Sequence, residues 1–126
     1  MEHLAFEEGE KILTEFRRCL KKGGVLRIAM PGLYWIIIEQ YGNDFKNEDW
    51  FPGGYESVQT KRMATNMAFY WWGHKYLYNE DDLRNHLIKA GLRKIKRCEW
   101  SRSDYPEPSN LEARKQSILI MEAEKE

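Results

Sequence analysis

One short stretch of this chain carries side chains suited to proton transfer and to ligand binding. It runs from Trp71 to Tyr78 and contains two tryptophans, a histidine and two tyrosines. The imidazole of His74 has an ordinary pKa near neutrality, so it can act as a general base. A single histidine can equally be a hydrogen-bonded structural residue, and both interpretations stay open. His74 and Tyr78 are our candidate catalytic residues.

Aromatic residues are concentrated around this stretch, with 13 of the 17 lying between Tyr34 and Tyr78. Ligand pockets tend to be lined by apolar and aromatic side chains with few polar groups. Trp71, Trp72, His74 and Tyr78 would then form an aromatic wall for a sugar or another planar ligand. In that interpretation Trp71 and Trp72 bind substrate. The alternative is a small aromatic core that holds the segment against the rest of the fold.

The elements that must position these side chains begin with a helix and a strand. Apolar residues recur at helical spacing from Phe6 to Leu20, which predicts an amphipathic helix. Gly23 or Gly24 can adopt the left-handed conformation that ends a helix. Val25 to Met30 reads as a strand, which Pro31 closes because proline has no N–H to donate. Ligands bind beyond the carboxyl ends of strands in open α/β sheets, so the segment from Pro31 onward is expected at the functional edge.

The remaining elements follow from periodicity and turn residues. They are a short helix (Leu33–Tyr41), a loop (Gly42–Gly54), a helix (Ser57–Trp72), a helix capped by Asn79 and ended by Gly91, a strand (Leu92–Trp100) and a last strand (Ser117–Ala123). The strand Leu92–Trp100 carries many lysines and arginines, which suit a strand at the edge of a sheet. The last strand is apolar on both faces, so we expect it between two neighbours.

The bulk composition excludes several classes of protein. The 20 basic and 20 acidic residues cancel to a net charge of +0, which gives no global field toward nucleic acid or an anionic membrane. Cys19 and Cys98 are too few and too far apart for a disulfide framework or a clustered metal site. The acidic start does not resemble a signal peptide, and the apolar run Leu33–Ile38 is far shorter than the ~20 residues that span a bilayer. We expect one cytoplasmic domain without nucleic-acid or membrane partners.

Several stretches carry a family resemblance. Leu20 to Pro31 resembles the L-K-P-G-G-x-L-x-I-x-x-P signature of class I S-adenosylmethionine-dependent methyltransferases, with Lys22 in place of the proline. Glu2–Leu4 resembles the E-H-L that ends the family's strand 4, and Leu87–Ile95 resembles its helix E leading into strand 6. Gly73–Asn79 resembles the G-H-K-W-x-Y-[DN] run of a subgroup associated with sugar or polysaccharide genes. The resemblance covers essentially the whole chain, but only the second half of the family's domain.

The resemblance implies a fold, a cofactor and a substrate class. The fold would be α/β and partly Rossmann-like, with a three-stranded mixed sheet in the order of family strands 5, 7 and 6. Helices would flank that sheet, and a helical aromatic insertion would occupy residues 33–78. The cofactor would be S-adenosylmethionine, with Glu2 and His3 as cofactor-binding candidates. The methyl acceptor would be a sugar or another small molecule.

The family's cofactor half is missing from this chain. No glycine-rich turn follows a first strand, and no acidic residue ends a second strand to hold the ribose. We therefore expect weak or no binding of S-adenosylmethionine, and no activity, from this chain alone. The leading interpretation is the substrate-side half of a methyltransferase domain. The alternative is a non-catalytic interaction or oligomerisation module derived from one.

The missing strands also predict a partner. Without the family's strand 4, the strand Val25–Met30 would have an unpaired edge on which only Arg27 is charged. Such an edge offers backbone groups to another chain. We expect a homodimer or a missing N-terminal half-domain to cover it.

Overall fold

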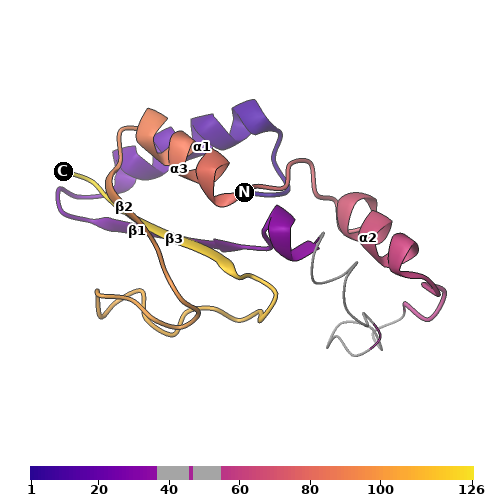
Figure 1. The fold of residues 1–126 in the computed structure, drawn as a ribbon. Coiled ribbons are helices and arrows are strands. Elements are labelled where there is room, and N and C mark those ends of the chain that lie inside the picture. The colour runs from indigo at the N-terminus through magenta and orange to yellow at the C-terminus, as the bar shows by residue number, and fades with distance from the viewer. Residues whose placement is uncertain (37–45, 47–54) are drawn as a thin grey trace.

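The computed structural model describes residues 1–36, 46 and 55–126, which form three helices and three strands (Figure 1). In chain order they are α1 (Phe6–Cys19), β1 (Val25–Met30), α2 (Lys61–Tyr70), α3 (Glu80–Lys89), β2 (Arg93–Arg97) and β3 (Leu119–Glu124). The α/β class is confirmed. Most of the predicted helix Leu33–Tyr41 and of the predicted loop Gly42–Gly54 lies outside the described residues. Within the described ranges, no helix has the length and apolar character needed to cross a membrane.

The three strands form one sheet in the order β1-β3-β2, so β3 is central. β1 is antiparallel to β3, with Met30 opposite Leu119. β2 is also antiparallel to β3, with a register irregularity between Arg93 and Lys96. The central position of the last strand is confirmed, but the mixed sheet needs correction. A mixed sheet requires at least one pair of neighbouring parallel strands. β1 and β2 point the same way, but β3 lies between them, so both neighbouring pairs are antiparallel.

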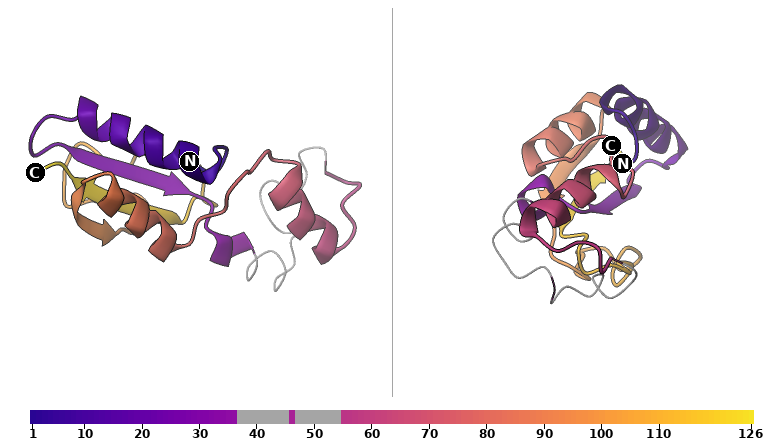
Figure 2. Two further views of the ribbon diagram at one scale, coloured as in Figure 1. Left: turned by 90° about the horizontal axis from the view of Figure 1, so that it is seen from above. Right: turned by 90° about the vertical axis from the view of Figure 1, so that its right-hand side faces the viewer.

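Helices α1 and α3 lie side by side over one face of the sheet (Figure 1, Figure 2). α3 begins as predicted at Asn79, whose side chain accepts a hydrogen bond of 2.7 Å from the Asp82 N–H. Gly91 follows α3 with φ of +82°, a conformation that favours glycine. The main core lies between these helices and the sheet and includes Leu13, Ile28, Met30, Tyr78, Leu83, Leu87, Leu119 and Met121.

The opposite face of the sheet is charged, and the segment 98–118 lies over it (Figure 1). Arg27 of β1 donates hydrogen bonds to Glu122 of β3 at 2.7 Å and to Glu112 of the covering segment at 2.5 Å. Lys96 of β2 lies 3.3 Å from the second carboxylate oxygen of Glu122. We call these four residues the Arg27 network. Its arginine and two glutamates are at most 6% exposed, so it joins the covering segment to the sheet.

The segment between β1 and α3 has an apolar core of its own, beyond the carboxyl end of β1 (Figure 2). One cluster contains Trp35, Ile36, Ala68 and Leu77, a second contains Val58, Ala64 and Met67, and Trp72 packs against both. α2 supplies residues to each cluster and begins at Thr60, whose side chain accepts from the Met63 N–H. Part of the aromatic segment therefore forms a core, as one of the two interpretations expected.

Candidate functional site

Two segments far apart in the sequence meet near the carboxyl end of β1. The Glu2 carbonyl accepts a hydrogen bond of 2.7 Å from the backbone N–H of Lys75. His3 Nδ1 lies 3.2 Å from the carbonyl oxygen of Gly73. Gly73 has φ of +72°, which glycine adopts without strain. These backbone contacts bring the side chains of Glu2 and His3 beside His74.

These three side chains form what we call the Glu2–His3–His74 cluster. One potential ligand atom from each residue lies within 4.8 Å of the other two. The two imidazole centroids are 5.0 Å apart, and His3 Nε2 is 3.6 Å from Glu2 Oε1. Glu2 Oε2 instead faces the Met1 amino group at 3.3 Å. The Glu2 side chain is 16% exposed and the His3 side chain 55%, so the cluster has a buried side and an open side.

The environment of His74 keeps its imidazole neutral. Burial lowers its pKa, and the neighbouring charge of His3 lowers it further. The Glu2 carboxylate and the nearby Ala68 backbone act in the opposite direction but do not outweigh these effects. His74 Nδ1 is buried and has no hydrogen-bond partner among the described residues. A neutral imidazole with a free nitrogen can accept a proton or bind a cation.

The cluster forms one wall of a pocket of about 660 Å³. The other walls are the end of β1 (Ala29 and Pro31), two aromatic residues (Tyr55 and Trp72) and the approach to β3 (Arg114, Gln116 and Ser117). The Trp72 ring meets the His74 ring edge to face at 5.9 Å. An aromatic surface next to a few polar groups suits a small polar ligand.

Four of the six candidate site residues line this pocket, namely Glu2, His3, Trp72 and His74. Their positions also agree with the functional edge expected from Pro31 onward, because Pro31 itself lines the pocket. The histidine is partly exposed and lies at the carboxyl end of β1. These four candidates therefore lie together at one pocket, and their functional role stays a prediction.

The other two candidates, Trp71 and Tyr78, do not line it. Trp71, the C-cap residue of α2, is 60% exposed. Trp72 lies in the turn that follows and packs inward against the two apolar clusters. Tyr78 is fully buried in the main core, 5.5 Å from the ring of His86, and burial raises its pKa to about 12. The predicted wall of four side chains is corrected to Trp72 and His74.

Sequence reasoning missed the wall formed by Arg114, Gln116 and Ser117. These residues belong to an irregular segment without a motif, so their types alone give no signal. Their position follows from the sheet, because Leu119 pairs with Met30 and the residues before it must pass the end of β1. Only the antiparallel pairing of the last strand with the first could have indicated them.

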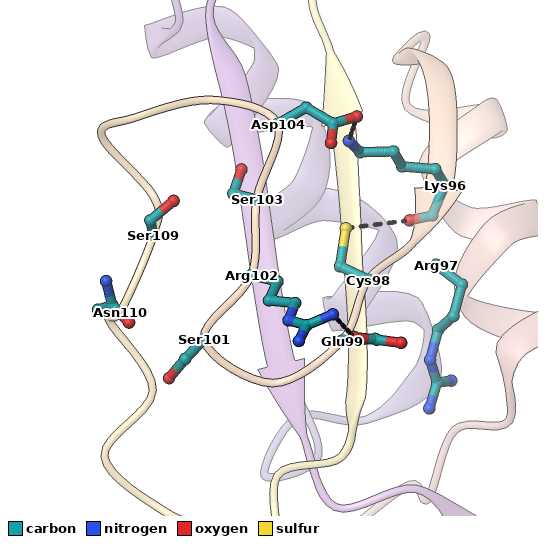
Figure 3. A pocket seen from close by; sticks show the side chains of 10 residues that line it. All are labelled: Lys96, Arg97, Cys98, Glu99, Ser101, Arg102, Ser103, Asp104, Ser109 and Asn110. Carbon is teal, nitrogen blue, oxygen red and sulfur yellow. Dashed lines mark hydrogen bonds and ion pairs between the residues drawn. The ribbon is translucent and has the colours of Figure 1, made fainter.

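A second hollow, of about 580 Å³, lies between β2 and the segment that follows it (Figure 3). Its charged side chains are already paired, Lys96 with Asp104 and Arg102 with Glu99 at 2.8 Å. Burial raises the pKa of the Cys98 thiol, which disfavours the reactive thiolate. Because its charges are paired and its thiol is protonated, we place the candidate site in the first pocket.

Comparisons with known proteins add no assignment. No protein-family model matches the chain, and no curated protein matches it. The basis for a function is therefore the pocket itself, with its neutral histidine, its aromatic surface and its position at the end of a strand.

Proposed function

We propose that this chain is the substrate-side half of a class I S-adenosylmethionine-dependent methyltransferase fold, and that the pocket binds the methyl acceptor. One observation carries the proposal. The three stretches that resemble functional parts of that family, at Glu2–His3, at the end of β1 and at His74, converge on one pocket. The strand order β1-β3-β2 supports it, since it agrees with family strands 5, 7 and 6 of a Rossmann-like sheet.

The pocket supports a small acceptor with a hydroxyl or amine group, such as a sugar. The indole of Trp72 offers an apolar face against which a sugar ring can pack. His74, neutral near pH 7, can accept a proton from the acceptor as that group becomes a nucleophile. In this proposal Trp72 orients the acceptor and His74 is the general base.

The described residues do not fit S-adenosylmethionine on their own. Gly32 lies two residues after the end of β1, but a Cβ atom there would lie 3.2 Å from the Cβ of Leu119, so its backbone faces packed core. Gly23 and Gly24 lie between α1 and β1 and open no helix. We expect calorimetric titration of the chain with S-adenosylmethionine to give a Kd above about 10 μM. A tighter complex with the isolated chain would contradict this expectation.

The cofactor side would then come from a partner along β1. β1 is an edge strand, and in the described chain its only strand neighbour is β3. Ala29 is exposed there, and unpaired edge groups readily add another strand. We propose that a missing N-terminal half-domain or a second copy of this chain pairs with β1. Sedimentation at increasing concentration separates the two, because a persistent monomer excludes the second copy.

Acceptor binding can be tested without the cofactor. We would titrate the chain with sugars and small hydroxyl compounds and follow the tryptophan indole N–H signals by NMR. The Trp72 signal should shift and the Trp71 signal should not. Trp72→Phe should weaken acceptor binding, whereas the matched control Trp71→Phe should leave it unchanged. Shifts confined to Trp71, or equal effects of the two variants, would contradict the assigned pocket.

The second candidate function is a non-catalytic interaction module. The unpaired edge of β1 and the poor fit to the cofactor favour it. If the chain is such a module, sedimentation should show association through β1, and no acceptor should shift the Trp72 indole signal in the NMR titration. A reading frame directly upstream of the Met1 codon that encodes a glycine-rich cofactor half would instead support the enzyme.

A further inference from the structure

The Glu2–His3–His74 cluster has the composition of a transition-metal site. Two imidazoles and one carboxylate suit Zn²⁺ and similar ions better than Mg²⁺ or Ca²⁺, which prefer oxygen ligands alone. We propose that these three side chains bind one divalent ion of the zinc type, with a coordination position open to the pocket. The inference goes beyond acceptor binding and stands on the geometry of the cluster. A bound ion would occupy the lone pair of His74, so His74 can act as a general base only in the ion-free chain. Acceptor binding at Trp72 does not depend on the ion, so acceptor binding and ion binding can each fail without the other.

The tautomer of His3 is the first argument. The carbonyl of Gly73 can only accept a hydrogen bond, so the nearby Nδ1 of a neutral His3 carries the hydrogen. The lone pair is then on Nε2, which faces the Glu2 Oε1 atom at 3.6 Å. Two acceptors facing one another repel unless a proton or a metal ion lies between them. In the neutral form of His3, a metal ion there would satisfy both atoms as a proton does.

The unpaired nitrogen of His74 is the second argument. Its Nδ1 atom is buried and has no hydrogen-bond partner among the described residues. When the ring hydrogen is on Nε2, the lone pair is on this buried Nδ1 atom and is available to a ligand. A buried polar atom without a partner is destabilising, and a bound ion would remove that penalty.

The His3 ring is held in the manner of a metal ligand. A histidine that binds a metal commonly donates its second ring N–H to a backbone carbonyl or carboxylate, which fixes the ring and the tautomer. His3 uses the Gly73 carbonyl in this way. The backbone of Glu2 is fixed in turn by Lys75. The three ligands thus arrive from two anchored segments.

The spacing requires only a small contraction. Ligand atoms of a tetrahedral zinc site lie about 3.4 Å apart, given bonds of about 2.0–2.1 Å. The three atoms here lie within 4.8 Å of one another. The His3 side chain is half-exposed, so a small shift of its ring that keeps the hydrogen bond to Gly73 can close the spacing. Glu2 can keep its contact with the Met1 amino group, because that contact uses Oε2 while Oε1 faces His3.

The test uses Zn²⁺ alone and reads the histidine nitrogens directly. Calorimetry should give one Zn²⁺ per chain with a Kd below about 100 μM. In ¹⁵N spectra, Zn²⁺ should shift His74 Nδ1 and His3 Nε2, while the other nitrogen of each ring stays protonated. His86, the third histidine of the chain, lies in the core and should not shift. This pattern would distinguish the site from nonspecific binding.

Matched variants complete the test. His74→Ala and His3→Ala should each weaken Zn²⁺ binding at least about tenfold. Glu2→Gln should weaken it, while Glu7→Gln, an exposed glutamate of α1, should not. Circular dichroism would establish that each variant is folded.

The choice of ion excludes two other modes of binding. Cu²⁺ and Ni²⁺ are avoided, because the free amino terminus, the next two backbone nitrogens and His3 Nδ1 can form a square-planar complex with them. With Co²⁺ as an optical probe, a sulfur-to-metal band would reveal binding by Cys19 or Cys98 instead. That band, no Zn²⁺ binding, or unchanged affinity in His74→Ala would each overturn the proposal.

Discussion

Two clusters of ionisable side chains in this chain differ in how completely their polar atoms are paired. In the Arg27 network, the guanidinium donates to Glu112, to Glu122 and to the carbonyl of Glu99. The remaining Glu122 oxygen forms an ion pair with Lys96 at 3.3 Å, although it makes no hydrogen bond. In the Glu2–His3–His74 cluster, the buried Nδ1 of His74 has no hydrogen-bond partner among the described residues, and Nε2 of His3 faces a carboxylate oxygen of Glu2.

The difference separates a structural cluster from a candidate site. The paired charges join β1, β2 and β3 to the segment that covers them, so the network satisfies itself and has nothing left to offer a ligand. The unpaired cluster is destabilising in the free protein, and a bound ion or ligand would complete it. The variants below test this distinction, from the largest expected effect to the smallest.

Arg27→Met should have the largest effect. It leaves Glu112 and Glu122 buried without their main counter-charge, and breaking a buried pair in this way costs about 3–5 kcal/mol. We expect urea unfolding to show a loss of that order. Adding Glu112→Gln and Glu122→Gln to the variant should recover part of it, because no unpaired charge then remains buried.

The control for this variant is Arg18→Met, which removes an exposed arginine paired with Glu15. Exposed pairs contribute little to stability, so the free energy of unfolding should hardly change. If Arg27→Met and Arg18→Met had equal effects, the Arg27 network would not be buried in solution.

Gly9→Ala should have the next largest effect. Glycine inside a helix is normally less stable than alanine, so this change would usually stabilise. Here the added Cβ would meet the hydroxyl of the buried Tyr78, with only 2.4 Å between the two atoms. We expect a loss of about 1–3 kcal/mol from overpacking.

Tyr78→Phe sharpens this test, because the Tyr78 hydroxyl is buried and has no hydrogen-bond partner in the described chain. The double variant should recover most of the loss measured by thermal unfolding. If Tyr78→Phe also abolished acceptor binding, the placement of Tyr78 in the core would be wrong.

The same contrast explains what the sequence could predict. Helices and strands came from local signals, such as the apolar face of α1 and the Asn79 cap, and their bounds differ from the structure by a few residues. The order of the strands followed from the apolar character of the last one and from the family resemblance. Glu2, His3, Trp72 and His74 were found because they occur in recognisable stretches.

The rest depends on contacts that local patterns do not encode. Arg27 reaches partners 85 and 95 residues away, and its position in an apolar strand gave no indication of either. Trp71 and Tyr78 were chosen as aromatic neighbours of the site. The direction of the Trp71 side chain was set by the end of α2, and that of Tyr78 by packing against α3. Residue type alone does not predict either direction.

Acid should destabilise the protein through the Arg27 network. Burial alone would raise the pKa of Glu122, but the neighbouring side chains of Ser103, Arg27 and Lys96 favour its charged form and hold the pKa below its ordinary value of 4.5. The pKa of Glu112 is lowered against burial chiefly by Arg27. A lowered folded-state pKa gives stability that is fully present above the unfolded-state value and is lost as the pH falls through the folded-state value.

We therefore expect the free energy of unfolding of the wild type to decline below pH 4.5. The decline should be smaller in Arg27→Met, since its carboxyl groups no longer favour the charged form. Urea unfolding over a pH series measures both proteins. Parallel pH profiles would show that other groups control acid stability.

His74→Ala should have the smallest effect on the metal-free protein. The variant loses the edge-to-face contact with Trp72, but it also removes a buried nitrogen without a partner. Since these contributions oppose one another, we expect a change within about 1 kcal/mol in either direction. A loss as large as that of Arg27→Met would mean that His74 is a structural residue.

Added Zn²⁺ should distinguish the wild type from His74→Ala, because an ion at 100 times its Kd stabilises only the chain that binds it, by about 2.7 kcal/mol. In thermal unfolding, the wild type and His74→Ala should differ little in stability without Zn²⁺, and with Zn²⁺ the wild type should become the more stable of the two. Arg27→Met keeps the three ligands, so Zn²⁺ should stabilise it as much as it stabilises the wild type.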